Sequence, residues 1–193
     1  MPSDATEVLS RPAPEPDRTV RYGPGDDHVI DIRLPRDGDG PRPLVVVVHG
    51  GFWRAAYDRR HTGPQASALA AAGYVVAVPE YHRVGQAAGG WPGTFDDTAH
   101  WSDRLVDLVC GEVGEDAVDR DRVVLVGHSA GGHLALWAAA RHRLPASSPW
   151  RRTAAIPVRG VVSLAGVCDL ALAARLRLSD GAAQDLMGGE PLP

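Results

Sequence analysis

The chain has 193 residues, of which 44% are hydrophobic and 23% charged, and its formal net charge is −4. This length suits one domain with a sizeable core, and basic and acidic residues are interspersed along it. The sequence therefore offers no basic surface for nucleic acid or an anionic membrane. No apolar run approaches the roughly 20 residues that a membrane-spanning helix needs. We expect a protein of the cytoplasm.

The first 18 residues are rich in proline and contain no apolar segment like that of a signal peptide. We expect a disordered leader over residues 1–18 and a single domain over residues 19–193. Cys110 and Cys168 cannot form a disulfide framework and have no metal-ligand spacing. Both lie beside apolar runs, so we predict two buried free thiols.

In chain order, the pattern alternates between strands and helices. Apolar and polar residues alternate at 28–35, which predicts a half-buried strand, and Val45–Val48 predict a strand buried on both faces. Pro64 and Gly73 suit the start and the end of a helix, and Thr94 begins a Thr-x-x-Asp helix cap. We further predict a helix over 63–73, a strand over 74–81, a helix over 94–113, a strand over 122–127, a helix over 130–142, a strand over 160–166 and short helices within 169–178 and 180–189. This order is typical of a mostly parallel α/β sheet with helices on both faces.

The stretch VVLVGHSAGGHLALWAAA, residues 123–140, joins a buried strand to a helix. Gly127, Ser129 and Gly131 match the G-x-S-x-G pattern, in which a serine stands on a strained turn between strand and helix. Small residues two positions before and after the serine allow the turn to pack against its neighbours. The strand before and the helix after favour a nucleophile over a surface serine.

A second motif, HGGFW, follows the strand Val45–Val48. Backbone N–H groups of such a loop stabilise an oxyanion, and glycines let the backbone approach the reacting carbonyl. By position, the predicted donors are the amides of Gly51, Phe52 and Ala130, with support from His49 and Gly50.

With both motifs, the chain resembles the α/β-hydrolase-fold serine hydrolases. Within them it is similar to the kynurenine formamidase and carboxylesterase branch, with bacterial feruloyl-esterase-like hydrolases as neighbours. The resemblance spans about residues 20–190 and includes PEYHRVGQAAGGWPGTFDD at 79–97. It implies that Ser129 attacks a small ester or amide and forms an acyl-enzyme, without a metal or an organic cofactor. The motifs do not decide between ester and amide substrates.

A serine hydroxyl is a weak nucleophile until a base takes its proton. The resemblance implies the chain order serine, acid, histidine, with the last two on strands beyond 160–166. The histidines after Ser129 are His133 and His142, on the helix that the serine begins, and neither is expected to reach it. We therefore expect an α/β-hydrolase sheet that lacks its last strands, and the alternative function is a non-catalytic pseudo-hydrolase or gene fragment. The strand at 160–166 would then be an exposed apolar edge, which predicts self-association.

Other polar and aromatic residues have two interpretations each. His49 is expected to orient its loop and His128 to pack locally, whereas His61, His82 and His100 are less favoured substitutes for the base. Asp96, Asp97 and His100 have helical spacing, for which capping or solvation is favoured over a metal. Asp169 is expected to shape the pocket rather than to act as the triad acid. Phe52, Trp53 and Trp91 either form an aromatic substrate pocket or pack loops onto the domain.

Overall fold

The structure is a computed structural model that describes residues 11–37 and 40–191. Its six-stranded sheet has the order β1-β2-β4-β3-β5-β6. Strands β4, β3, β5 and β6 are parallel, while β1 and β2 run antiparallel at one side. This confirms the predicted mostly parallel sheet. The strands are β1 (Arg18–Arg21), β2 (Val29–Arg33), β3 (Arg42–Val48), β4 (Val75–Pro79), β5 (Val118–His128) and β6 (Gly160–Leu164).

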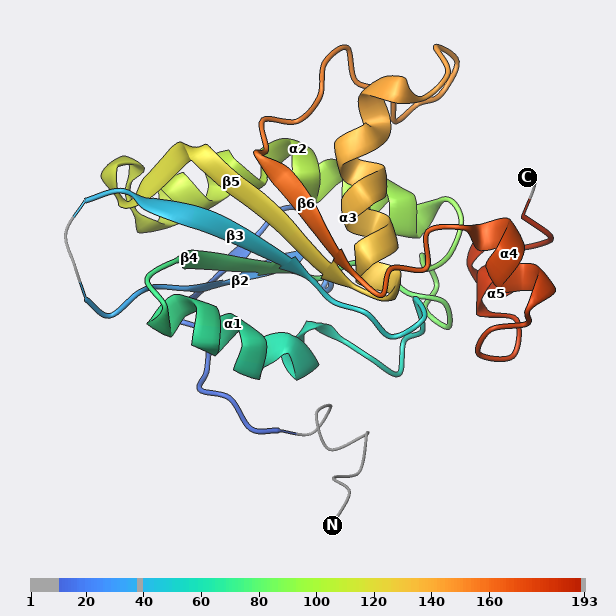
Figure 1. The fold of residues 1–193 in the computed structure, drawn as a ribbon, viewed down its shortest axis with the longest axis horizontal. Coiled ribbons are helices and arrows are strands. Elements are labelled where there is room, and N and C mark those ends of the chain that lie inside the picture. Colours follow the sequence, from blue (N-terminus) through green and yellow to red (C-terminus); the bar gives the residue numbers. More distant parts are fainter. Residues whose placement is uncertain (1–10, 38–39, 192–193) are drawn as a thin grey trace.

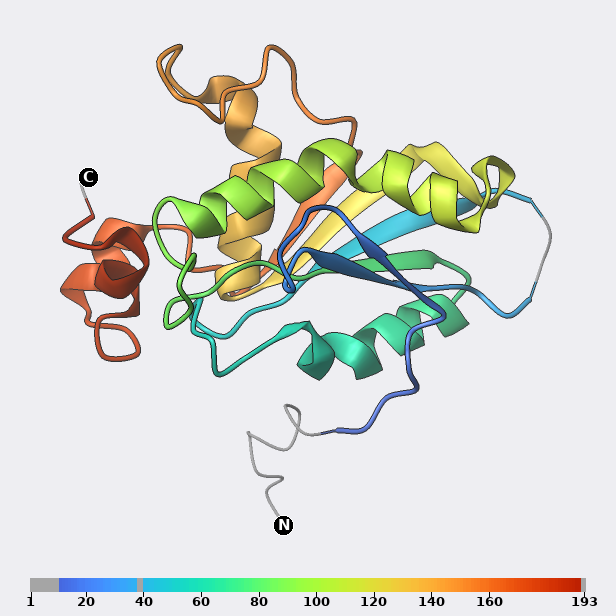
Figure 2. The same cartoon turned by 180° about the vertical axis from the view of Figure 1, so that it is seen from behind.

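Helices cover both faces of the sheet, as predicted. Helix α1 lies on one face, and α2 and α3 lie on the other (Figure 1, Figure 2). Helices α4 and α5 form a small unit beyond the ends of the strands (Figure 1). No helix of the described residues is long and apolar enough to cross a membrane. The α-helices are α1 (Gly63–Ala71), α2 (Gly93–Val113), α3 (Ala130–Ala140), α4 (Leu170–Arg175) and α5 (Ala182–Met187), and the short 3₁₀ helices are η2 (Arg59–Thr62), η3 (Glu115–Ala117) and η4 (Arg141–Arg143).

The two faces of β3 pack into separate apolar layers. Val45 and Val47 join the cluster under α1, whereas Val46 and Val48 join the larger core under α2 and α3. Successive side chains of a strand point to opposite faces, so a continuous valine run satisfies both layers. The sequence pattern therefore identifies β3 correctly as a strand buried on both faces.

Strand β2 differs from its prediction, because all five of its residues are buried. Ile30 and Ile32 enter the core under α2. On the opposite face, Asp31 accepts hydrogen bonds from Arg59 at 2.7 and 3.2 Å, and Arg33 donates to main-chain carbonyls of the preceding segment. Apolar and polar side chains do alternate along β2, but its polar face is covered by hydrogen-bonding protein groups and not by water.

Part of the segment predicted as a disordered leader lies against β2. Arg33 donates to the carbonyls of Pro14 and Glu15 at 2.6 and 3.1 Å, and the Asp17 amide donates to Ile32 at 2.9 Å. These bonds give residues 14–17 defined partners, unlike the expectation. The remainder of that prediction, residues 1–10, lies outside the described residues.

Strand β6 lies at the edge of the sheet and exposes apolar side chains, as predicted. Val162 is 45% exposed and Leu164 43% exposed. The prediction for Cys168, which follows this strand, is wrong because its thiol is exposed, whereas Cys110 is buried as expected. Because β6 has no neighbouring strand on its outer side, the loop that follows it, including Cys168, is open to solvent on that side.

The predicted cap of α2 is also wrong. The helix begins at Gly93 without a side-chain cap. The Thr94 hydroxyl instead donates to the His82 carbonyl at 2.6 Å and accepts from the Gly90 amide at 3.0 Å. Thr94 therefore fastens the loop between β4 and α2 rather than the end of the helix.

Candidate active site

Ser129 stands at the sharp turn between β5 and α3. Its backbone has φ 53° and ψ −118°, a conformation that costs a residue with a side chain roughly 1–3 kcal/mol. The Ser129 amide donates to Leu164 at 2.9 Å, and the Ser129 carbonyl accepts from Val167 at 3.2 Å. The last residue of β6 and the loop after it thus bond to both sides of the turn. Strain supported in this way is what the sequence motif predicts for a nucleophile.

The two glycines of the motif allow a very close approach of backbones. A Cβ atom at Gly127 would lie 2.2 Å from the Gly131 carbonyl oxygen. A Cβ atom at Gly131 would lie 2.1 Å from the Val48 oxygen and 2.4 Å from the His49 oxygen. No side chain fits at either position without moving the backbone. These contacts hold the turn of Ser129 against the end of β3.

The loop after β3 lies directly against this turn. A Cβ atom at Gly50 would lie 3.3 Å from Cβ of Ser129. The next three residues have positive φ angles, 110° at Gly51, 51° at Phe52 and 56° at Trp53. This run of left-handed backbone is rare outside glycine. It places the predicted oxyanion loop beside the predicted nucleophile.

Trp53 anchors this loop from within the protein. Its side chain is 1% exposed and belongs to the main core. Its carbonyl accepts from the Val84 amide at 2.7 Å, which ties the loop to the segment after β4. Of the two interpretations of Trp53, packing of the loop onto the domain is therefore correct, and its ring is no wall of an open pocket.

His49 supports the loop through hydrogen bonds, as predicted. Its Nε2 lies 2.7 Å from Oε1 of Glu80, and its Nδ1 lies 2.9 Å from the Gly50 carbonyl. Both side chains are fully buried. Burial alone would raise the pKa of Glu80, but the charge and hydrogen bond of His49, together with Arg83, bring that pKa down to about 2. Sequence reasoning did not assign Glu80, although a lone carboxylate directly after a buried strand could have signalled it.

His133 lies one helical turn after the nucleophile but does not serve it as a base. Its ring packs edge-on against Trp53 and Phe95, with centroid distances of 5.5 and 5.9 Å. Burial lowers the pKa of His133 to about 4. His142, in η4, is bonded to the Ala139 carbonyl of α3. Both placements confirm the expectation that neither histidine reaches the Ser129 hydroxyl.

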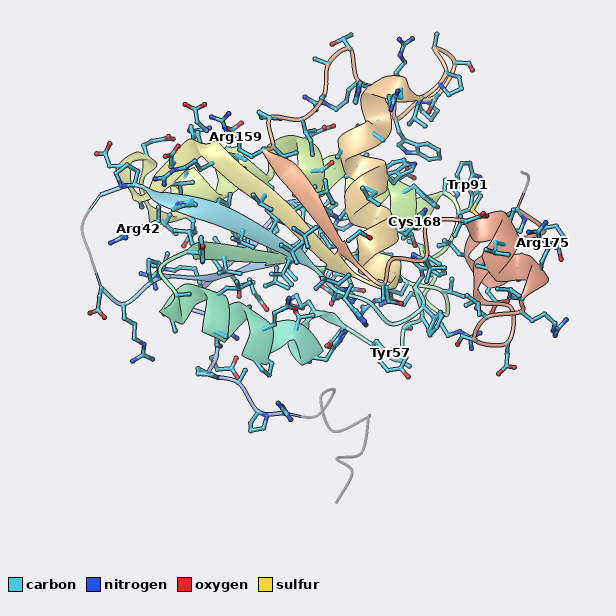
Figure 3. All side chains as sticks on the ribbon, viewed as in Figure 1. Arg42, Tyr57, Trp91, Arg159, Cys168 and Arg175 are labelled. Carbon is cyan, nitrogen blue, oxygen red and sulfur yellow. The ribbon has the colours of Figure 1, made fainter. Side chains whose placement is uncertain are left out.

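Trp91 is the exposed aromatic residue of this end of the sheet. It is 49% exposed and packs edge-on against Phe95 at 5.3 Å and Trp150 at 4.7 Å. Its amide donates to Leu186 at 2.7 Å, which links it to α5. Figure 3 shows Trp91 and Cys168 at the end of the sheet where the parallel strands finish, opposite Arg42. Trp91 can therefore contact a ligand at this end.

The sequence as a whole matches a known family. The BD-FAE family model matches residues 30–192, which is most of the chain. This protein belongs to the BD-FAE family. Its α/β-hydrolase fold accordingly carries the strained serine and the glycine loop in the positions described.

Several curated relatives of this BD-FAE protein are esterases by name. Isoprenylcysteine alpha-carbonyl methylesterase of Arabidopsis thaliana is 32% identical over 120 residues, 61% of this chain and 26% of that protein. Esterase LipQ of Mycobacterium tuberculosis is 29% identical over 154 residues, 78% of this chain and 35% of that protein. The chain thus spans about a quarter to a third of the length of these relatives.

Solved structures share the fold of this BD-FAE domain. Esterase B from Lactobacillus rhamnosis superposes with a TM-score of 0.70 at 23% identity, over 92% of this chain and 60% of that one. An esterase from Thermogutta terrifontis superposes with a TM-score of 0.63 at 22% identity, over 90% and 63%. Both confirm the α/β-hydrolase architecture.

Asp97 joins two histidines of the BD-FAE domain rather than the predicted partners Asp96 and His100. It is buried and accepts from Nε2 of His28 at 2.9 Å and from Nδ1 of His82 at 2.7 Å, so the expectation of a solvated or capping residue is wrong. The ligand atoms of these three residues lie within 4.8 Å of one another, close enough to bind one metal ion. However, the Gly25 amide donates to Nδ1 of His28, so the proton of that ring sits on Nε2, where a metal would bind. The arrangement favours a hydrogen-bonded link between β2, β4 and α2.

The remaining candidate bases are occupied elsewhere. His61 donates through Nδ1 to the Asp58 carbonyl, and His100 accepts from Arg104. The His128 side chain is exposed. Asp169 caps α4 by accepting from the Leu172 amide at 2.8 Å. Across residues 11–37 and 40–191, no histidine is hydrogen-bonded to the Ser129 hydroxyl.

Proposed function

We propose that this BD-FAE protein hydrolyses carboxylic esters through an acyl-enzyme on Ser129. The observation that carries the proposal is the close approach of Gly50 to the strained turn of Ser129, because Gly50 leads directly into the left-handed loop at Gly51 and Phe52. Backbone strain of this kind persists where the surrounding structure enforces it, and it gathers at catalytic sites. The esterase names of the plant and mycobacterial relatives agree with this chemistry.

In the proposed reaction, the Ser129 oxygen attacks the ester carbonyl and the alcohol leaves. The amides of Gly51, Phe52 and Ala130 are the proposed donors to the oxyanion, each contributing about 3–4 kcal/mol to the barrier reduction. Water then attacks the acyl-enzyme, releases the acid and restores the serine. All eight histidines of the sequence lie in described residues and none bonds to the Ser129 hydroxyl, so we propose that the histidine that takes the serine proton, and its acid, are supplied by a segment or partner chain other than these 193 residues.

A kinetic burst tests this proposal. With p-nitrophenyl acetate, an acyl-enzyme predicts a rapid release of p-nitrophenol followed by slower turnover. Ser129→Ala should abolish the burst, and Ser147→Ala, at an exposed loop serine, should retain it. Weak turnover without a burst would favour the non-catalytic alternative, because oxyanion stabilisation and binding alone give roughly 10³–10⁴-fold catalysis over water.

We propose a small ester as the substrate. The resemblance to formamidases suggests a small amide as the alternative substrate. The relatives and the solved structure described above are named as esterases, and none of them is named as a formamidase. Turnover of N-formylkynurenine faster than that of p-nitrophenyl acetate would reverse this preference. Trp91 is the residue proposed to contact the apolar part of the substrate, since its ring is half exposed at the strand ends.

We also propose that the β6 edge associates with a second copy of this chain. Its free backbone groups can pair with another strand, and Val162 and Leu164 present apolar surface beside them. Replacing Val162 and Leu164 by lysine and measuring self-association by sedimentation velocity tests this contact.

A further inference from the structure

Both ring nitrogens of His49 face hydrogen-bond acceptors. Nε2 lies 2.7 Å from the Glu80 carboxylate, and Nδ1 lies 2.9 Å from the Gly50 carbonyl. The Tyr81 hydroxyl, 3.5 Å from Nδ1, already donates its proton to the His49 carbonyl at 2.8 Å, so it offers Nδ1 only a lone pair. A neutral imidazole has one N–H and one bare nitrogen. Either neutral tautomer would therefore point a lone pair at an acceptor inside the core.

We propose that His49 is held as an imidazolium ion at neutral pH, so that a buried positive charge lies at the base of the oxyanion loop. In this form Nε2–H donates to Glu80 and Nδ1–H donates to Gly50. Every ring proton then has a partner, as buried polar groups require.

The charges around His49 balance only if its ring is charged. Two arginines and three carboxylates form one connected network: Arg59 lies 2.7 Å from Asp31 and 3.8 Å from Glu80, and Arg83 lies 3.1 Å from Asp27 and 3.3 Å from Glu80. With a neutral His49 the network would keep an excess negative charge next to a fully buried carboxylate. The imidazolium supplies the third cation. Charges in a protein interior are retained when they are paired in this way.

The rings that pack against His49 accommodate the charge. The Tyr81 ring stacks on it with centroids 4.3 Å apart and an interplanar angle of 9°, which presents an aromatic face to the cation. His61 approaches edge-on at 5.7 Å and is the remaining titratable ring in contact. Burial lowers the pKa of His61, and the charge of His49 lowers it further. His61 therefore stays neutral, and no second cation opposes the first.

The imidazolium acts on the active site through the Gly50 carbonyl. Its Nδ1–H bond fixes the peptide that joins Gly50 to Gly51, and hence the direction of the Gly51 amide. A fixed positive charge behind that amide also favours negative charge developing at the carbonyl oxygen in front of it. His49 is thus a positioning residue. This catalytic consequence rests on the proposed esterase function, whereas the protonation state of His49 does not.

Nitrogen NMR of the histidine rings in the complete chain tests the protonation state without any substrate. In protein labelled with ¹⁵N-histidine at neutral pH, we expect both ring nitrogens of His49 to carry protons. His61 is the internal reference and should show one protonated and one bare nitrogen, because only its Nδ1 donates. A bare ring nitrogen on His49 at neutral pH would overturn the proposal, whatever the activity of the protein.

Removing the partner charge gives a second, independent readout. Glu80→Gln should convert His49 to the one-proton pattern of His61, whereas Glu112→Gln, at a carboxylate on the protein surface 3.8 Å from Arg18, should leave it unchanged. If the burst of the native protein shows esterase activity, Glu80→Gln should lower kcat by roughly tenfold with little change in KM, as expected for loss of transition-state stabilisation. An intact two-proton pattern in Glu80→Gln would overturn the assigned pairing. A two-proton pattern in a protein without esterase activity would refute the proposed function alone.

Discussion

The two sides of Ser129 are built in opposite ways. On the β3–β4 side, His49, Trp53 and Glu80 are each at most 1% exposed; His49 is hydrogen-bonded to Glu80, and the Trp53 ring packs against His133. On the β6 side, Val162 and Leu164 are more than 40% exposed, and Leu176 beyond α4 is 61% exposed. The first side is arranged to hold backbone amides still. The second side offers apolar surface to a partner.

The two sides also differ in the burial of their left-handed backbone. Trp53 on the first side is buried, whereas Ala165, Arg177 and Asp180 on the β6 side also have positive φ angles but are exposed. Strained conformations survive only when surrounding contacts determine them. Substitutions on the β3–β4 side should therefore cost much more than matched substitutions on the β6 side or at the exposed rim.

The largest difference is expected for the two tryptophans. Trp53→Ala removes a fully buried ring that anchors the oxyanion loop, and it should lower the free energy of unfolding by about 3–5 kcal/mol. Trp91→Ala removes a ring that is 49% exposed and should cost about 1 kcal/mol or less. Urea denaturation of both variants measures the difference. An equal loss of unfolding free energy in both variants would contradict the stronger packing of the β3–β4 side.

Alanine substitutions at two glycines compare the backbone packing of the two sides. Gly131→Ala forces a methyl group against the Val48 and His49 carbonyls and should destabilise the fold by about 3 kcal/mol. Gly160→Ala, at the start of β6, meets no atom within 4 Å and should change stability by less than about 0.5 kcal/mol. Thermal unfolding of the pair provides the measurement. A tolerated alanine at 131 would contradict the close packing of the nucleophile turn.

The pH dependence of stability tests the enclosed side through His133. Its pKa falls from 6.5 to about 4 on folding, so the folded state binds fewer protons than the unfolded state in this range. The stabilisation is complete above pH 6.5 and is lost as the pH falls towards 4, with a total on the order of 3 kcal/mol. His133→Phe should remove this slope and His142→Gln should not, as denaturation curves between pH 7 and 4 will show. A native slope that persists in His133→Phe would place its origin elsewhere.

The smallest effect on stability, but a clear effect on association, is expected at the β6 edge. Replacing Val162 and Leu164 together by lysine should change the free energy of unfolding by less than about 1 kcal/mol, because both side chains are largely exposed. Charged side chains at an edge strand oppose pairing with another chain. We expect the native chain to self-associate in sedimentation velocity and the double variant to be monomeric, with Ala71→Lys on α1 as the control. A monomeric native chain would refute the proposed contact.

The sequence predicts the parallel core and the turn of Ser129 because both rest on local rules. Runs of valine such as Val45–Val48 need two apolar faces, and Gly127 and Gly131 have no alternative at such close backbone contacts. These features depend on residue type and spacing alone.

Features that depend on distant partners could not be predicted in this way. Strand β2 alternates like a half-exposed strand, but Arg59 and the carbonyls of residues 14 and 15 cover its polar face. Thr94 resembles a helix cap but bonds to His82. Glu80 and Asp97 gain their roles only when His49 and His28, far away in the chain, are brought to them.

The central claim is that Ser129 is the nucleophile of an assembled site. Reaction of the protein with a fluorophosphonate probe, followed by peptide mass spectrometry, tests it most directly. We predict a single adduct on Ser129 that is absent from Ser129→Ala and retained in Ser147→Ala. No adduct, or an adduct on another residue, would contradict the account.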